Sequence, residues 1–194
     1  MRRRHLLWTI LLAGCTGPSP GDIPAGVPSP RAFLAAIKPA DLGRETEVGQ
    51  LVTVSHGDKA ITVEARLSVK RDRVLMVAQD MLGQRLMTVR WDDAGVAVER
   101  SPNLPDSVSP QAILADLVAI SWPAPAVQRA LAGSGARLVE QPGQRVIMLG
   151  GRETLHATIG WPGGDGPGAR WTGSMSYRNV RAGYTVSVQS VEQP

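Results

Sequence analysis

The sequence is poor in cysteine and in aromatic residues, and each shortage excludes a class of protein. A single cysteine among 194 residues excludes an intrachain disulfide framework and a zinc site with several cysteine ligands. The formal net charge of +4 includes Arg2, Arg3 and Arg4, so the rest of the chain carries only +1, scattered among acidic residues. A basic stripe interleaved with stacking aromatics, typical of nucleic-acid binders, is therefore absent from the sequence.

Sequence motifs for catalysis and for metal binding are also lacking. The chain contains neither a Gly-x-Ser-x-Gly nor a Ser-x-x-Lys motif, and none of its three lysines follows a glycine-rich loop. Neither His56 nor His156 has a neighbouring cysteine, aspartate or histidine at the spacing of a metal site. We therefore predict no catalytic residues, no metal and no cofactor. A hydrolase using Ser174 or Ser176 with His156 is the weakest hypothesis, since only the fold could bring these residues together.

The first fifteen residues are typical of an exported bacterial protein. A run of arginines precedes the apolar stretch 6–12, which is far shorter than the ~20 apolar residues that span a bilayer. The stretch ends in Leu12-Ala13-Gly14-Cys15, which resembles the lipobox of bacterial lipoproteins. This resemblance implies that residues 1–14 are a signal peptide and that Cys15 is lipidated. An ordinary secretory peptide with a chance cysteine is the alternative.

The position of Thr16 and the residues after it extend this prediction. Threonine rather than aspartate follows the cysteine, which in enterobacterial lipoproteins implies sorting to the outer membrane. We expect the protein to be lipid-anchored there, on the periplasmic face. Residues 15–30 are rich in proline, glycine and small polar residues, so they are predicted to form a flexible tether.

Residues 31–194 are predicted to form a single, mainly β domain. Between residues 59 and 70 apolar and polar side chains alternate, which is typical of a half-buried strand. Short turns join such segments into an antiparallel meander. The expected strands are 50–55, 59–70, 73–80, 84–91, 95–100, 136–141, 144–149, 152–160, 170–178 and 183–191.

Three helices are expected beside these strands, at 31–38, from Pro110 to the Trp122-Pro123 pair, and at 124–132. So many strands with one-sided alternation predict one strongly curved antiparallel half-barrel sheet, whose concave apolar face needs a helical lid. The cavity between sheet and lid is predicted to be lined by Val63, Ala65, Leu67, Met76, Met87 and Val89 from the strands and by Ile113, Leu117 and Val118 from the lid.

The turn Met81-Leu82-Gly83 is unusual, because turns favour small and polar residues. Its two large apolar side chains either fold back into the core or project to insert into an apolar phase. The tryptophans pose a similar choice between a boundary with an apolar phase and ordinary packing. Four of them lie near the ends of expected elements: Trp91, Trp122, Trp161 and Trp171.

With these features in place, the chain resembles the LolA/LolB-type lipoprotein carriers, whose fold is an open half-barrel with a helical lid over an acyl-binding cavity. The most specific match is residues 74–84, which resemble a strand, an apolar tip and the next strand of LolB. There a leucine before a glycine projects and helps to deliver lipoproteins into the membrane. The resemblance implies this membrane-engaging role for Leu82 and its neighbours Met81 and Gly83.

A closer similarity covers most of residues 73–191. The segments 113–117, Trp122-Pro123 and Gly183-Tyr184 resemble an uncharacterised family of LolB-like outer-membrane lipoproteins that accompany aryl polyene biosynthesis clusters, often beside a LolA-like protein. The resemblance implies an outer-membrane-anchored, non-enzymatic protein that binds acyl chains, as acceptor or carrier for lipoproteins or for an aryl polyene-type lipid. It also implies a periplasmic LolA-like carrier as a partner.

The alternative is a structural or assembly lipoprotein of an envelope complex. It would have the same fold with a filled core and no ligand. A carrier needs an empty apolar cavity, and a scaffold does not.

Overall fold

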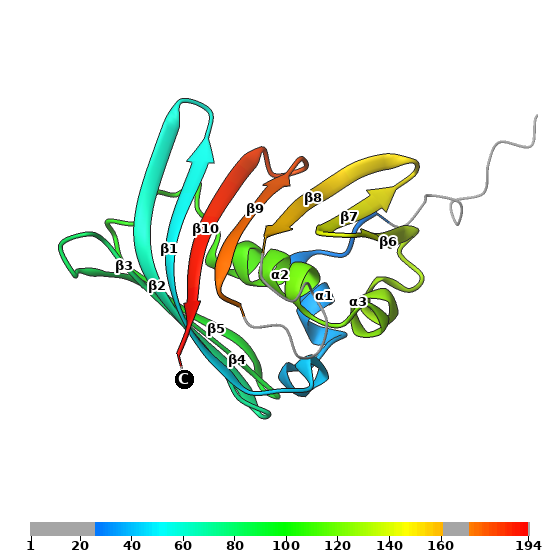
Figure 1. The fold of residues 1–194 in the computed structure, drawn as a ribbon, viewed down its shortest axis with the longest axis horizontal. Coiled ribbons are helices and arrows are strands. Elements are labelled where there is room, and N and C mark those ends of the chain that lie inside the picture. The colour runs from blue at the N-terminus through cyan, green and yellow to red at the C-terminus, as the bar shows by residue number, and fades with distance from the viewer. Residues whose placement is uncertain (1–25, 161–170, 194) are drawn as a thin grey trace, which may run out of the picture.

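The computed structural model describes residues 26–160 and 171–193 as a sheet with helices on one side (Figure 1). The chain begins with α1 (Pro30–Ala35) and the 3-10 helix η1 (Pro39–Leu42). Five strands follow: β1 (Thr46–His56), β2 (Lys59–Val69), β3 (Arg73–Gln79), β4 (Arg85–Asp92) and β5 (Gly95–Arg100). Then come α2 (Pro110–Ser121), α3 (Ala124–Leu131), β6 (Ala136–Gln141), β7 (Gln144–Leu149), β8 (Arg152–Gly160), β9 (Gly173–Asn179) and β10 (Tyr184–Glu192).

All ten strands belong to one antiparallel sheet with the order β5-β4-β3-β2-β1-β10-β9-β8-β7-β6. The first and last strands therefore lie side by side in the middle, and the two halves of the chain extend outward from them. The sheet stays open, with β5 and β6 at its edges, and it curves around the three helices (Figure 1). The predicted curved half-barrel with helices over its concave face is confirmed.

Three boundaries differ from the sequence prediction by more than one residue. The strand expected at 50–55 begins at Thr46, because Val48 is buried opposite Leu67 although Gly49 interrupts the apolar alternation. The helix expected at 31–38 ends at Ala35, because the residue before Pro39 is restricted to extended backbone. The strand expected from residue 170 begins at Gly173.

Tryptophans pack inside the molecule rather than at a boundary with an apolar phase. The ring of Trp122 lies between those of Trp91 and Trp171, with centroid distances of 5.9 and 6.2 Å. All three are at most 3% exposed, and the Trp122 Nε1–H donates to the Lys38 carbonyl at 3.0 Å. The boundary interpretation is therefore wrong for these three, while Trp161 lies outside the described residues.

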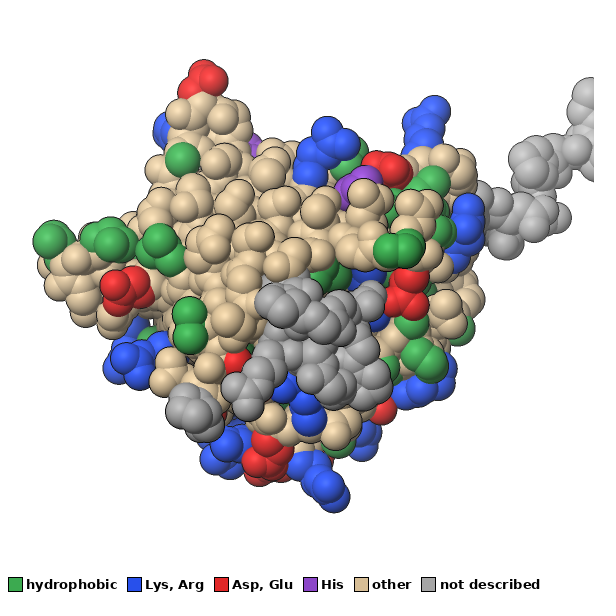
Figure 2. Space-filling model, viewed as in Figure 1, with side chains coloured by type: hydrophobic (Ala, Val, Ile, Leu, Met, Phe, Trp, Pro, Cys, Tyr) green, Lys and Arg blue, Asp and Glu red, His purple; other side chains and the backbone are tan. Residues whose placement is uncertain are grey.

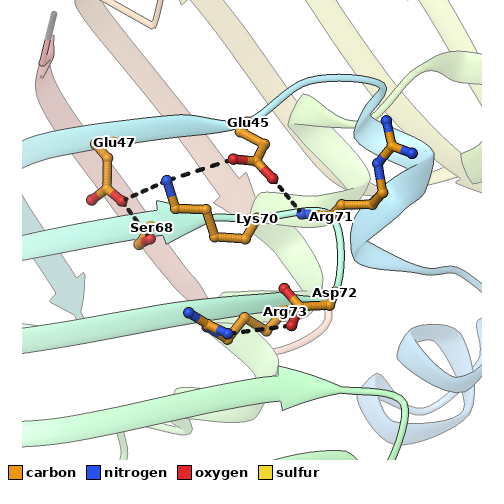
Figure 3. A network of polar contacts seen from close by, with 7 residues as sticks. All are labelled: Glu45, Glu47, Ser68, Lys70, Arg71, Asp72 and Arg73. Atoms are coloured by element: carbon orange, nitrogen blue, oxygen red, sulfur yellow. Dashed lines mark hydrogen bonds and ion pairs between the residues drawn. The ribbon is translucent and has the colours of Figure 1, made fainter.

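Polar contacts tie the β2–β3 turn to the segment that enters β1 (Figure 3). The Lys70 ammonium points between two carboxylates, 3.3 Å from Glu47 and 3.7 Å from Glu45. The Arg71 backbone N–H donates to Glu45 at 3.2 Å. Such exposed pairs contribute at most ~1 kcal/mol each, so they fix this turn without dominating the stability of the sheet.

Candidate functional site

The central helix α2 covers the concave face of the sheet. It begins where the Ser109 hydroxyl accepts a hydrogen bond from the Ala112 N–H at 3.3 Å, with Pro110 at the first helical position. It ends at Trp122, just before Pro123. Its side chains Leu114, Val118 and Ile120 are fully buried. We call α2 the lid helix.

An apolar cavity of about 50 Å³ lies between the lid helix and the sheet; we call it the inner cavity. Its origin is local, because Ala65 on β2 and Ala78 on β3 are register partners and both line it. Two short side chains opposite one another leave space that larger residues fill elsewhere in the sheet. On the adjoining strands the Gln50 amide donates to the Ser190 hydroxyl at 3.0 Å.

The size of the inner cavity decides what fits it in this conformation. A water molecule occupies about 30 Å³ of the liquid, and an apolar cavity of about 150 Å³ admits benzene. The inner cavity, at about 50 Å³, is too small for a membrane acyl chain. The core beneath the lid helix is therefore nearly filled, and a long ligand requires the lid helix to move.

Six of the nine residues predicted to line a cavity surround this one: Val63, Ala65, Met76, Met87, Ile113 and Leu117. Leu67 and Val89 are buried but do not line the cavity, although Met76, the register partner of both, does. Val118 is also buried away from the cavity, because successive helical residues point about 100° apart.

Sequence reasoning missed the contribution of the central and C-terminal strands. Because β10 pairs with β1, side chains from β1, β9 and β10 complete the wall of the inner cavity. No local pattern in the sequence predicts that the first strand pairs with the last. The added residues include Val52, Val54, Met175, Tyr177, Val186 and Val188.

A larger hollow of about 470 Å³ adjoins the inner cavity; we call it the outer hollow. It lies between the β1–β2 turn and the loop 101–109 that leads into the lid helix. The Arg100 guanidinium holds this loop, donating to the carbonyls of Val108 at 3.0 Å and Leu104 at 2.9 Å. It also contacts the Asp106 carboxylate at 3.0 Å.

The β3–β4 turn projects from the sheet and carries hydrophobic side chains (Figure 2). Leu82 is 84% exposed and Met81 is 62% exposed. The Asp80 carboxylate accepts hydrogen bonds from the backbone N–H groups of Leu82 and Gln84, each at 2.9 Å. Gly83 has φ +80°, which favours glycine. The turn thus holds two large apolar side chains in water; we call Met81-Leu82-Gly83 the apolar tip.

A protein-family model described as "Protein of unknown function (DUF3261)" matches residues 47–192, from β1 to the end of β10. The chain belongs to the DUF3261 family. No curated protein matches the sequence. Among solved structures, the crystal structure of a DUF1329 family protein from Desulfovibrio piger matches with a TM-score of 0.35 and 9% identity, covering 84% of this chain and 92% of that chain.

The lid helix of this DUF3261 protein is pinned to the sheet by a buried carboxylate that sequence reasoning did not single out. Asp116 is 8% exposed and accepts hydrogen bonds from the Tyr184 hydroxyl and, at 3.0 Å, from the Asn179 amide. Burial raises the pKa of Asp116 to about 6, although these hydrogen bonds oppose the rise. Burial and the nearby Asp116 raise the pKa of Tyr184. A lone acidic residue among apolar helix positions was the available signal.

A second attachment, Arg145 on β7, holds the C-terminal end of the lid helix. Its guanidinium donates to the carbonyls of Ile120 and Trp122, at 2.8 and 2.5 Å. It also lies 2.6 Å from the Glu140 carboxylate. The lid helix is therefore attached at its middle and at its C-terminal end.

His156, the base of the weakest hypothesis, lies on β8 beside a carboxylate. In the described ranges no three metal-ligating side chains cluster, and His156 contacts the Glu153 carboxylate at 3.2 Å. No helix among these residues has the length and hydropathy needed to cross a bilayer. Residues 1–25, which include the predicted signal peptide, Cys15 and most of the tether, lie outside the described part of the chain.

Proposed function

We propose that this DUF3261 protein is an outer-membrane-anchored, non-enzymatic lipoprotein that binds acyl chains beneath its lid helix. It acts as a LolB-like acceptor or carrier for lipoproteins or an aryl polyene-type lipid. The observation that carries the proposal is the 84% exposed Leu82 at the apolar tip. A hydrogen-bonded turn that holds a leucine in water gains free energy only when the leucine meets an apolar phase.

The inner cavity supports the acyl-binding part of the proposal. The cavity lies between the lid helix and the sheet, beside Ala65 and Ala78. A ligand that displaces the lid helix therefore enlarges a space that already exists. Each methylene buried contributes ~0.8 kcal/mol, so ten methylenes contribute ~8 kcal/mol. Breaking the hydrogen bonds that Tyr184 and Asn179 donate to the ionised Asp116 carboxylate costs ~2 kcal/mol each. Burial of the acyl chain therefore offsets the loss of these hydrogen bonds.

One observation favours the structural alternative. The inner cavity holds only about 50 Å³, so the protein is well packed without a ligand. A scaffold lipoprotein with a filled core needs no lid movement, and its exposed Leu82 would then contact a protein partner.

Native mass spectrometry separates the two functions. The full chain with Cys15→Ser lacks the thiol predicted to be lipidated, so any acyl species recovered with it is cargo. We expect about one acyl species per protein, and lipid extraction identifies its class. The matched variant Ala65→Leu fills the inner cavity and should carry none. A clean apo mass for both proteins, with no uptake of added fatty acid, contradicts acyl binding and supports the scaffold.

A further inference from the structure

The two ends of the lid helix differ in how firmly they are held. At the C-terminal end, the carbonyls of Ile120 and Trp122 accept hydrogen bonds from the buried Arg145. The Trp122 ring is enclosed between Trp91 and Trp171. The buried side chains of Arg145, Trp91 and Trp171 therefore enclose this end of the lid helix. A ligand cannot pass here without separating these buried side chains.

The N-terminal end faces the outer hollow instead. Four apolar side chains line both this hollow and the inner cavity: Val54, Ile61, Val108 and Ile113. These side chains thus lie between about 470 Å³ of surface hollow and the inner cavity. Two of them, Val108 and Ile113, belong to the loop before the lid helix and to the lid helix itself. Movement of that end joins the two spaces.

The lining of the outer hollow changes from apolar to polar toward solvent. Beyond the four apolar side chains it is bordered by exposed residues of the β1–β2 turn and of the loop 101–109. These residues include His56, Asp58, Lys59, Ala60 and Ser107. An amphiphile lying across this boundary keeps its polar end in water and its chain against the apolar layer.

We propose that the outer hollow is the portal through which an acyl chain enters tail first, while its polar end stays beside Lys59 and Ser107. This inference rests on the proposed function and names its substrate class: an amphiphile with an acyl chain and a polar end that remains outside. Once the hydrogen bonds to Asp116 at its middle are broken, the lid helix turns about its fixed Trp122 end and its N-terminal end opens. Because the hollow faces solvent, it does not limit the size of the ligand's polar end.

A blocking experiment tests the portal. In the full chain with Cys15→Ser, Ala60→Cys places a single thiol at the outer hollow, and Ser176→Cys places one on the exposed face of β9, outside the hollow. Each is coupled to a polyethylene glycol maleimide, and uptake of cis-parinaric acid is followed by its fluorescence. We expect coupling at residue 60 to slow uptake at least tenfold and coupling at residue 176 to leave it unchanged.

The possible outcomes are distinct. Equal uptake rates for the two coupled proteins overturn the portal while leaving acyl binding intact. Absence of uptake by the uncoupled parent overturns the proposed function, and the portal with it. Equal slowing by both couplings also overturns the portal, because the effect would then not depend on which residue carries the polymer.

A charge reversal tests where the polar end lies. Lys59→Glu should weaken binding of cis-parinaric acid about fivefold at low salt, the range of an exposed ion pair, and leave binding of its methyl ester unchanged. The matched reversal Glu153→Lys on β8, outside the hollow, should change neither. Equal affinity of wild type and Lys59→Glu for the acid overturns the placement of the polar end.

Discussion

The Nη1 atom of Arg145 on β7 lies 2.8 Å from the carbonyl oxygen of Ile120 in the last turn of the lid helix. The last carbonyls of a helix have no partner within it and carry partial negative charge. The guanidinium satisfies these carbonyls, and its side chain is only 3% exposed. The helix end and the sheet edge near β7 are thereby fixed to each other.

Replacing this side chain should destabilise the whole domain. Arg145→Met leaves the carbonyls of Ile120 and Trp122 without this donor and removes the ion pair to Glu140, so we expect a loss of about 3 kcal/mol in the free energy of unfolding. Urea denaturation measures it. Arg152→Met, at an exposed position on β8, is the control and should change stability by less than ~0.5 kcal/mol. Equal effects of the two variants would show that Arg145 does not fix the lid helix.

The buried carboxylate of Asp116 should make stability depend on pH. Folding raises its pKa from 3.8 to about 6, so between these values the folded protein keeps a proton that the unfolded chain releases. The free energy of unfolding should therefore fall by about 3 kcal/mol as pH rises from about 4 to above 6, then level off. The fall should be absent in Asp116→Asn. Parallel pH profiles for the two proteins would contradict this assignment.

The apolar tip should act in membrane delivery without affecting folding. Leu82→Glu changes a side chain that is 84% exposed, so its unfolding midpoint should match that of the wild type. Burying a leucine in an apolar phase contributes about 2 kcal/mol, so vesicle binding should fall more than tenfold. The control Val180→Glu alters another exposed apolar residue, 46% exposed in the β9–β10 turn. Full delivery by Leu82→Glu would rule out the tip as the membrane contact.

The rigidity of the turn can be separated from its hydrophobicity. Asp80→Ala removes the hydrogen bonds to the N–H groups of Leu82 and Gln84 but keeps the leucine. We expect vesicle binding to weaken about threefold, because the tip must then be ordered on contact. Asp92→Ala is the matched control, since Asp92 accepts from the Ala94 N–H at 2.9 Å in the β4–β5 turn. If vesicle binding weakens equally in both variants, the order of the apolar tip has no specific role in membrane contact.

Local patterns predicted most of the secondary structure. The alternation from Ile61 to Val69 predicted β2 within a residue at its C-terminal end, because one face of the strand meets the core and the other meets water. Pro110 and the Trp122-Pro123 pair likewise predicted both ends of the lid helix. Such signals lie within a few residues of the element they define.

The cavity was harder to predict, because its size depends on contacts between distant residues. Ala65 and Ala78 form a gap only when β2 and β3 pair in this register. The contact of Asp116 with Tyr184 joins residues 68 positions apart. The orientation of Leu82 also depended on the turn, since a leucine beside a glycine is compatible with folding inward or outward until the hydrogen bonds of Asp80 are known.

The pairing of the first strand with the last has a consequence for biogenesis. Without β10 the sheet separates into two meanders, β1 to β5 and β6 to β9, and the lid helix lacks Tyr184. During N-to-C synthesis, therefore, the cavity wall is completed only when the last strand has emerged. Until then its apolar surfaces are exposed, so the emerging chain stays prone to aggregation for longer than a protein with only local strand pairing.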